Sequence, residues 1–266
     1  AISGQEVFRF GDKGRGVCEF YYPLFLSNSF AYDSLIIYDI PVGRLTKIDL
    51  HALVENQDIT KCVNSEHLYR NLNFMYNFNK IDSAFIGTFI EKDEGLFSFC
   101  NRNNGEIKNT DYVPYYFYEK GRKDAYCHHV LVSEKDNSII VPFKYMNLIN
   151  CYDLDGNLKV TYALDWIKEE INTQIRVDEH TTVTFYRTYA TRNRCYLVWD
   201  GHKIEEELRK YPAKIVVMNW QGELEKVYQL DNFADFIIPD EKQRMIYVGV
   251  YNAGLEFVEI YKYPML

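Results

Sequence analysis

The chain has 266 residues, with 30 basic and 38 acidic side chains and a net charge of −8 at neutral pH. At this length, and with 47% hydrophobic residues, it can bury a sizeable core, which excludes a disordered chain and a fold that depends on metal or disulfides. The acidic balance and the absence of a basic run exclude a nucleic-acid partner, because phosphate binding needs clustered lysine and arginine. No apolar stretch is long enough for a transmembrane segment.

Aromatic residues are unusually frequent, with 23 Tyr, 17 Phe and 3 Trp, and Tyr and Phe favour β-strands. In chain order, strands are predicted at Ser34–Asp39, Gly95–Phe99, Ser138–Phe143, Leu148–Tyr152, Lys214–Asn219, Asp235–Pro239, Met245–Tyr251 and Glu256–Tyr263. Two charged segments, Asp165–Ile171 and His202–Lys210, are predicted as short helices, because the second carries opposite charges four residues apart. The sequence therefore indicates an all-β protein with two short helical insertions.

A repeated turn organises these strands. Counted from Gly156 and from Gly222, both copies carry Leu at +2, Tyr at +6, Leu at +8 and Asp at +9. Looser copies surround Gly4, Gly43 and Gly105, and each Gly is expected to supply the positive φ of a hairpin turn. Five such turns at blade-like spacing predict a single domain over residues 1–266, a five-bladed β-propeller; a β-sandwich would not repeat the turn with matched positions.

The two chain ends are predicted to complete one blade together. The C-terminal stretch supplies three strands and no fourth, whereas Gln5–Phe10 reads as a strand with no inner strands of its own. We therefore expect residues 1–10 to provide the outer strand of the last blade and to close the ring. Ala1–Gly4 carries neither the basic nor the apolar region of a signal peptide, which indicates a cytoplasmic protein or a mature form.

The six cysteines are not spaced as a metal or redox motif, since no two of them form C-x-x-C. Several lie within or beside apolar strand runs and are expected to be small buried hydrophobic residues, with disulfides left open as an alternative. They are Cys18, Cys62, Cys100, Cys127, Cys151 and Cys195.

The segment Phe8–Phe20 resembles the TolB-like six-bladed propellers of gut Bacteroidetes, which carry F-G-x-x-G-x-G-P-G-E-F after the outer strand of their first blade. Val17 and Cys18 stand where that family has Pro and Gly, and the matching residues are Gly11, Gly14, Gly16, Glu19 and Phe20. The resemblance implies six blades rather than the five counted here. It also implies a periplasmic or cell-surface protein, often a lipoprotein, with no established activity. NHL-type and YWTD-type propellers share the turns more broadly.

Candidate ligand-binding residues come from the predicted inner strands. Neighbouring strand residues point to opposite faces, so His128 and His129 do not suit one metal ion, and we predict that one of them faces the channel from an innermost strand over Tyr126–Val130. On the predicted inner strand Thr184–Tyr189, Arg187 and Tyr189 suit a carboxylate or a sugar through bidentate hydrogen bonds and stacking. The alternative is an Arg187 paired with an Asp of a neighbouring blade. The full channel set is His128, Arg187, Tyr189, Asp33 and Asp235.

No nucleotide, metal or nucleophile motif accompanies these residues. The glycine-rich loop Gly11–Gly16 fits neither the P-loop nor the dinucleotide pattern and is expected to be a connector between blades. The sequence thus favours a monomeric, non-enzymatic binding or scaffolding module that presents one ring face to a protein or glycan partner, without cofactor or metal. The alternative is a glycoside hydrolase with channel-mouth carboxylates about 5–9.5 Å apart, drawn from Asp33, Glu66 and Asp235.

Overall fold

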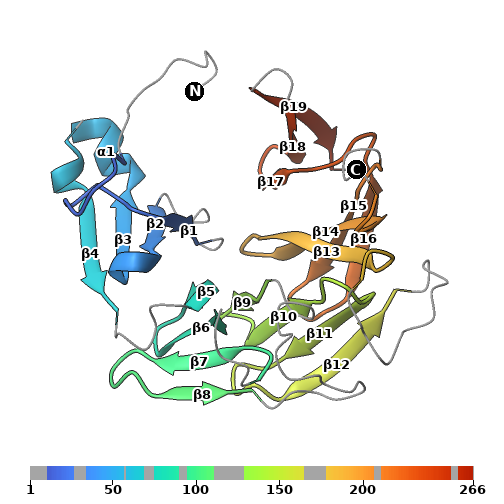
Figure 1. Cartoon of the computed structure of the whole chain (residues 1–266), viewed down its shortest axis with the longest axis horizontal. Coiled ribbons are helices and arrows are strands. Elements are labelled where there is room, and N and C mark those ends of the chain that lie inside the picture. The colour runs from blue at the N-terminus through green and yellow to red at the C-terminus, as the bar shows by residue number, and fades with distance from the viewer. Residues whose placement is uncertain are drawn as a thin grey trace.

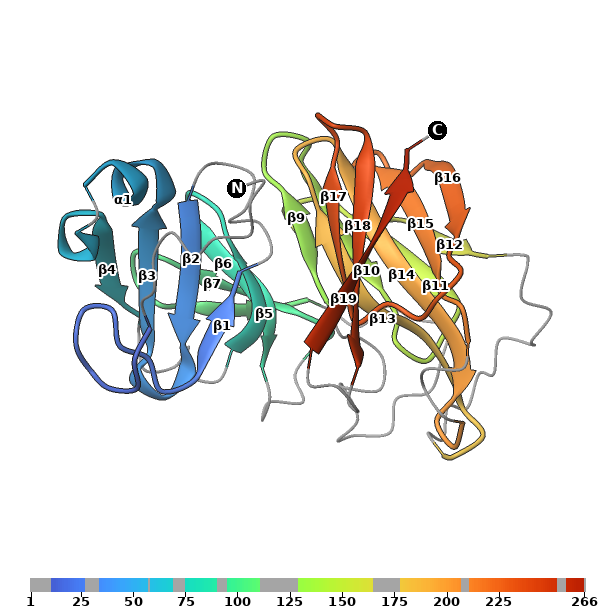
Figure 2. The same cartoon turned by 90° about the horizontal axis from the view of Figure 1, so that it is seen from above.

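The fold is described by a computed structural model that covers residues 11–26, 34–56, 58–68, 75–89, 95–110, 129–164, 178–206, 211–252 and 257–265. Five antiparallel sheets stand in a ring, and the first strand of each sheet lies toward the centre (Figure 1). Seen from above, the sheets stand upright beside one another (Figure 2). The chain is therefore the predicted all-β five-bladed propeller. Among the described residues, no helix has the length and apolar character needed to cross a lipid bilayer.

Each blade is a meander that runs from the inner to the outer strand. Blade 1 consists of β1 (Pro23–Phe25), β2 (Ser34–Asp39), β3 (Arg44–Asp49) and β4 (Val63–His67). Blade 2 consists of β5 (Met75–Lys80), β6 (Ala84–Phe89), β7 (Ser98–Asn101) and β8 (Ile107–Asn109). Blade 3 consists of β9 (Leu131–Ser133), β10 (Ser138–Pro142), β11 (Leu148–Tyr152) and β12 (Leu158–Ala163). Blade 4 consists of β13 (Thr182–Ala190), β14 (Arg194–Lys203), β15 (Lys214–Asn219) and β16 (Leu224–Gln229).

Blade 5 has three strands in the part of the chain that the structure describes: β17 (Phe236–Asp240), β18 (Met245–Asn252) and β19 (Phe257–Pro264). The helical elements belong to blade 1, where the helix α1 (Leu50–Asn56) and the short 3-10 turn η3 (Ile59–Lys61) connect β3 to β4. A second 3-10 turn, η2 (Ile40–Val42), lies between β2 and β3. The sequence did not predict α1.

The repeated turn has one physical form in blades 2, 3 and 4. Gly105, Gly156 and Gly222 have φ of 72°, 87° and 88° and lie between the third and fourth strands of their blades. Each turn begins with a side-chain oxygen that accepts hydrogen bonds from backbone N–H groups two to four residues later. The residues that supply this oxygen are Asn101, Asp153 and Asn219. This capping explains why Asp or Asn precedes the glycine.

Gly43 does not occupy the equivalent turn. It has a positive φ of 63°, as expected, but it lies between β2 and β3, the second and third strands of blade 1. The position of this hairpin within its blade accounts for the long spacing from Gly43 to Gly105. Gly4 lies outside the described residues.

Apolar side chains from successive blades interdigitate around the ring. Tyr38 and Phe78 meet edge to face between blades 1 and 2, with ring centroids 4.8 Å apart, and Phe97 and Tyr152 do so at 5.2 Å between blades 2 and 3. Similar clusters join blades 3 and 4 and blades 4 and 5. On its other face, blade 1 is covered by its own chain, where α1 and Phe20 pack on Ile37 and Ile48.

One face of blade 5 is apolar and exposed. Strand register places Phe236 and Ile260 on either side of Gly249, and it places Tyr251 opposite Val258. These side chains are among the exposed large hydrophobic residues of the chain. The opposite face of the same blade is buried against blade 4. Within the described residues, blade 5 therefore has one packed face and one exposed face.

Gln5–Phe10 lies outside the described residues, so its pairing with β19 stays a prediction. We expect deletion of residues 1–10 to lower Tm by on the order of 5–10 °C, because β19 would lose its hydrogen-bonding neighbour. Hydrogen exchange should also accelerate at those β19 amides that do not face β18. Deletion of residues 1–4 alone, which spares the strand, should change neither quantity. Equal β19 exchange in both truncated chains would contradict the closure.

The structure corrects the helix predicted over His202–Lys210. His202 and Lys203 are the last residues of β14, paired with Val183 and Thr182 of β13, and a turn follows at residues 204–206. His202 is buried, so strand pairing outweighs the local charge spacing that favoured a helix. Residues 207–210 and the other predicted helix, Asp165–Ile171, lie outside the described residues.

The described cysteines are free thiols: Cys62, Cys100, Cys151 and Cys195 are buried, as expected of small hydrophobic residues, and Cys18 is half-buried. Burial raises the pKa of Cys151 to about 11, which keeps its thiol protonated. Cys127 lies outside the described residues.

Candidate functional site

The predicted channel residues fall into three groups. Arg187 and Tyr189 lie on β13, the inner strand of blade 4, as predicted, and Asp235 directly precedes β17, the inner strand of blade 5. His128 and Asp33 lie outside the described residues. Tyr189 is half-buried and packs on the core between blades 4 and 5.

Glu66 is not a channel residue. It lies on β4, the outer strand of blade 1, where it pairs with Lys80 and lies 3.9 Å from Arg102. The prediction that it joins a set of channel-mouth carboxylates is therefore wrong, because that prediction took an outer strand for an inner one.

The described inner strand of blade 3 begins directly after the segment that was predicted to form it. It starts at Leu131, so the predicted strand Tyr126–Val130 precedes β9, and its first residues lie outside the described part of the chain. The ring nitrogen Nε2 of His129 lies 3.0 Å from the backbone carbonyl oxygen of Tyr186 on β13. His129 thus connects blade 3 to the strand that carries Arg187.

Arg187 forms an ion pair with Asp200, on β14 of the same blade. Its Nη1 lies 3.0 Å and 3.3 Å from the two carboxylate oxygens, and the side chains are 17% and 1% exposed. Irregular register between Phe185 and Arg187 shifts β13 against β14, so that Arg187 is paired with Val198 and still reaches Asp200. The sequence analysis gave an Asp of a neighbouring blade as the alternative partner of Arg187. The partner is instead an Asp on the adjacent strand of the same blade.

Opposing effects act on the pKa of the Asp200 carboxyl. Burial raises its pKa to about 7, Arg187 acts in the opposite direction, and the charge of nearby Asp235 adds to the rise. Asp235 itself accepts a 2.6 Å hydrogen bond from the backbone N–H of Tyr251. Asp200 is almost fully buried behind Arg187, whereas Asp235 is half-buried and one of its oxygens accepts a backbone N–H.

Cations and aromatic rings alternate beside this ion pair. The guanidinium carbon of Arg187 lies 4.7 Å from the ring centroids of both Tyr186 and Phe233. Lys144, in the loop between β10 and β11, places Nζ 5.1 Å from Tyr186 and 4.7 Å from Tyr145. We call this set the channel ladder: Tyr145, Lys144, Tyr186, Arg187 and Phe233.

The channel ladder spans three blades and is half-exposed apart from Phe233, which is buried. Within the described residues, Asp200 occupies Nη1 of the Arg187 guanidinium. Nη2 and Nε are then the donors that a ligand could use. Two cations fixed by aromatic faces can bind an anionic group and stack a sugar ring or another planar group. Sequence reasoning identified Arg187 but missed Lys144 and Phe233. Their loops are distant from Arg187 in the sequence, and it is the arrangement of the blades that brings them beside β13.

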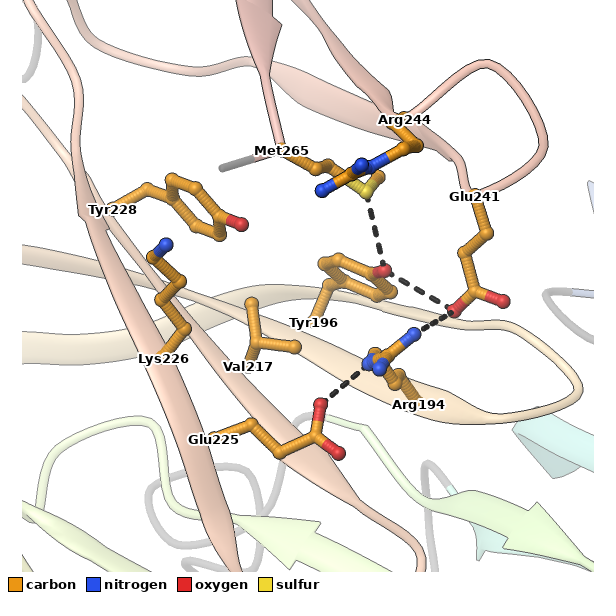
Figure 3. Close-up of a pocket in the computed structure, with 9 residues that line it drawn as sticks. All are labelled: Arg194, Tyr196, Val217, Glu225, Lys226, Tyr228, Glu241, Arg244 and Met265. Atoms are coloured by element: carbon orange, nitrogen blue, oxygen red, sulfur yellow. Dashed lines mark hydrogen bonds and ion pairs between the residues drawn. The ribbon is translucent and has the colours of Figure 1, made fainter.

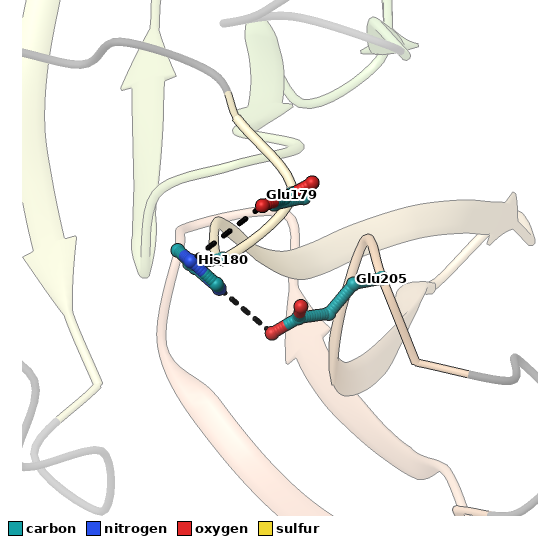
Figure 4. A group of neighbouring side chains, drawn as sticks. All are labelled: Glu179, His180 and Glu205. Carbon is teal, nitrogen blue, oxygen red and sulfur yellow. Dashed lines mark hydrogen bonds and ion pairs between the residues drawn. The ribbon is translucent and has the colours of Figure 1, made fainter.

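An exposed group at the rim of blade 4 has the residue types of a metal site. The ligand atoms of Glu179, His180 and Glu205 all lie within 4.8 Å of one another (Figure 4). His180 Nδ1 lies 2.7 Å from Glu205 and Nε2 lies 3.8 Å from Glu179, so the two ring nitrogens face different carboxylates. The hydrogen bond and charge of Glu205 raise the pKa of His180, which favours an imidazolium in an ion-pair cluster over a metal ligand.

The fold and the ladder define the class: a five-bladed β-propeller with a cationic, aromatic patch beside its inner strands. No family model matches this sequence, and neither does any curated protein. The chain is similar in fold to a DUF4221 member from Bacteroides vulgatus, with a TM-score of 0.55 and 11% identity over 97% of this chain and 82% of that chain. A hypothetical selenium-binding protein from Sulfolobus tokodaii has a TM-score of 0.50 and 8% identity over 88% of this chain and 56% of that one.

A catalytically inactive virginiamycin B lyase from Staphylococcus aureus is also similar, with a TM-score of 0.46 and 12% identity over 93% of this chain and 73% of that chain. At their identities, the likeness to the DUF4221 member and to the Sulfolobus tokodaii protein shows a shared fold alone, and one fold can host unrelated functions. The number of blades counted from the turns is confirmed, whereas the resemblance to TolB-like six-bladed propellers remains a resemblance.

Proposed function

We propose that this chain is a non-enzymatic β-propeller module that binds a carboxylate-bearing glycan or protein partner at the channel ladder. The observation that carries the proposal is the alternation of Lys144 and Arg187 with Tyr145, Tyr186 and Phe233 across three blades. Asp200 uses one guanidinium nitrogen and fixes the side chain, so that the remaining donors are pre-oriented for an oxyanion.

The aromatic faces favour an acidic glycan over a peptide. Tyr145 is partly exposed, and a sugar ring can pack on its face while the carboxylate of the sugar reaches Lys144 or Arg187. A propeller of the TolB-like kind would meet such polymers outside the cytoplasm, and we place this module in the periplasm or at the cell surface on that resemblance alone.

The hydrolase alternative has little support among the described residues. Of its three candidate carboxylates, Glu66 lies on an outer strand, Asp33 lies outside the described residues, and Asp235 holds a backbone N–H. A hydrolase also needs an acid that reaches the substrate, whereas the carboxyl with the raised pKa, Asp200, is 1% exposed.

Isothermal titration calorimetry with oligogalacturonate tests the proposal. Neutral maltohexaose and a poly-glutamate peptide serve as comparison ligands. We expect oligogalacturonate to bind, and Lys144→Gln or Arg187→Gln to weaken it about tenfold, the effect of one charge-assisted hydrogen bond. Lys242→Gln, an exposed lysine in the hairpin between β17 and β18, is the matched control and should have no effect.

Each comparison has a defined meaning. Tighter binding of poly-glutamate than of oligogalacturonate would assign the ladder to a protein partner. Equal binding of neutral and acidic sugars, or equal losses in all three variants, would overturn the proposal. Release of reducing ends from oligogalacturonate would instead support the hydrolase.

A further inference from the structure

A pocket lies between blades 4 and 5 (Figure 3). It has a volume of about 410 Å³, and its walls come from β14, β15, β16, the hairpin between β17 and β18, and Met265. Arg194 lies at the start of β14, and Asp200, the partner of Arg187, lies toward the other end of that strand. The pocket and the ladder are therefore at opposite ends of the blade.

The two carboxylates of the pocket are already satisfied by the protein. Arg194 forms ion pairs with Glu225 and, at 3.7 Å, with Glu241. Glu241 also accepts hydrogen bonds from Thr191 Oγ1 at 2.6 Å, and from the Tyr196 hydroxyl at 3.2 Å. The remaining charged residues of the lining, Lys226 and Arg244, are both cations, so the pocket is net positive on a chain of net charge −8.

Arg244 is held over this pocket by an unusual backbone. Its φ is 57°, in the left-handed region that Gly and Asn adopt more readily than Arg, and the corresponding hairpin of blade 3 has Asn137 there with φ of 48°. Its carbonyl oxygen accepts the N–H of Met265 at 2.8 Å, which fixes the hairpin against the end of the chain. Within the described residues, its guanidinium makes no hydrogen bond or ion pair, and Figure 3 shows it directed over Tyr196 and Met265.

The wall opposite the cations is apolar and aromatic. Tyr196 lies beneath Arg244, its hydroxyl engaged by Glu241 and 3.8 Å from the sulfur of Met265. Tyr228 lies under Nζ of Lys226, 5.4 Å from the ring centroid, and Val217 contributes to the floor. Tyr196 and Val217 are almost fully buried, so a ligand here would meet the cationic donors together with the partly exposed ring of Tyr228.

We propose that this pocket is a second binding site, specific for a small carboxylate attached to a planar aromatic body, with Arg244 binding the carboxylate. The volume lies within the range of small-molecule sites, and cations beside a partly exposed aromatic ring can fix the orientation of a planar anionic ligand. The positive local charge on an acidic protein selects the anion over its neutral analogue.

Calorimetry with indole-3-acetate and indole-3-acetamide on the full chain tests this site. The two probes differ in charge and share the ring, and we expect the acetate to bind at least tenfold more tightly. Arg244→Asn should remove that preference without a loss of Tm, because Asn accepts the left-handed backbone. Arg192→Asn, an exposed arginine in the neighbouring turn between β13 and β14, is the matched control and should retain it.

Further comparisons separate this site from the channel ladder. Arg187→Gln should leave indole-3-acetate binding unchanged, so the two proposals can fail independently. Equal affinities for the acetate and the amide would overturn the proposal, as would an affinity that Arg244→Asn leaves intact. Absence of acetate binding at about 10 mM would do the same, since that limit corresponds to less than about 3 kcal/mol.

Discussion

Replacement of Arg44 by Met is expected to lower the free energy of unfolding by roughly 3–5 kcal/mol, because it leaves the carboxylate of Asp39 buried without its cation. The Arg44 and Asp39 side chains are 7% and 0% exposed, and their charged atoms lie 3.9 Å apart. Asp39 also accepts the backbone N–H groups of Tyr21 and Tyr22, which hold the chain beside β2. Removal of the cation therefore disturbs more than one ion pair.

The same guanidinium fastens the glycine-rich loop to blade 1. Arg44 Nη1 donates to the carbonyl oxygens of Arg15 and Gly16, at 3.1 Å and 2.7 Å, and Nη2 donates to that of Glu19. The loop carries Phe20 into the core between β2 and α1. Loss of the Arg44 guanidinium should free the loop and uncover this core. We therefore expect trypsin to cleave faster after the exposed Lys13 and Arg15 in Arg44→Met than in the wild type.

Thermal unfolding and limited proteolysis check this prediction together. A loss of 3–5 kcal/mol corresponds to a Tm lower by about 10 °C for a domain of this size. Lys47→Met is the matched control, because Lys47 is an exposed cation on the same strand. If both variants unfold at the same temperature and resist trypsin equally, Arg44 does not anchor the loop.

The local regularities of this fold could be predicted from the sequence. Ser34–Asp39 and Lys214–Asn219 are strands with the predicted bounds, because each is a short apolar run that ends in a turn residue. The repeated glycine turns could be predicted for the same reason, since Asn or Asp caps the turn within a few residues of the glycine. Such patterns involve only neighbours in the chain.

The motif shared with TolB-like propellers also has a local cause. The Glu19 carboxylate accepts the backbone N–H of Gly16 at 2.8 Å and folds back over the loop. A Cβ at Gly14 would lie 2.0 Å from an oxygen of that carboxylate, so any other residue there would force the Glu19 side chain to shift. The resemblance therefore reflects how this connector folds against blade 1 and does not itself report a binding activity.

Contacts between distant segments could not be predicted. Asp200 stands in the apolar run of β14, and only the irregular register of β13 brings Arg187 within reach of it. Phe233 and Lys144 approach the same arginine and Tyr186 from other blades. The helix predicted over His202–Lys210 failed for a related reason, since its charge spacing is local whereas the partner strand β13 is not.

Replacement of Arg187 by Met is expected to destabilise the protein more at high pH than at low pH. The folded pKa of Asp200, about 7, lies above its unfolded value near 3.8, so its stabilising contribution is complete below the unfolded value and is lost as pH rises through 7. Without the guanidinium, burial and the charge of Asp235 act on Asp200 unopposed, and its folded pKa rises further. The variant then continues to lose stability at pH values where the wild type no longer does.

The difference can be estimated from the same linkage. Below about pH 6, Asp200 is protonated in both proteins, and the substitution should cost on the order of 1 kcal/mol, the value of a hydrogen bond to a neutral group. Above pH 7, the gap widens by up to about 1.4 kcal/mol per pH unit, which gives roughly 3 kcal/mol at pH 8.5. Urea unfolding of both proteins at pH 5.5 and pH 8.5 measures this change.

The double variant Arg187→Met with Asp200→Asn separates titration from packing. It removes both charged groups, so its stability relative to Asp200→Asn alone should be the same at the two pH values. A cost of Arg187→Met that does not change with pH would contradict the prediction, because it would mean that Arg187 does not alter the protonation of folded Asp200 between pH 5.5 and pH 8.5.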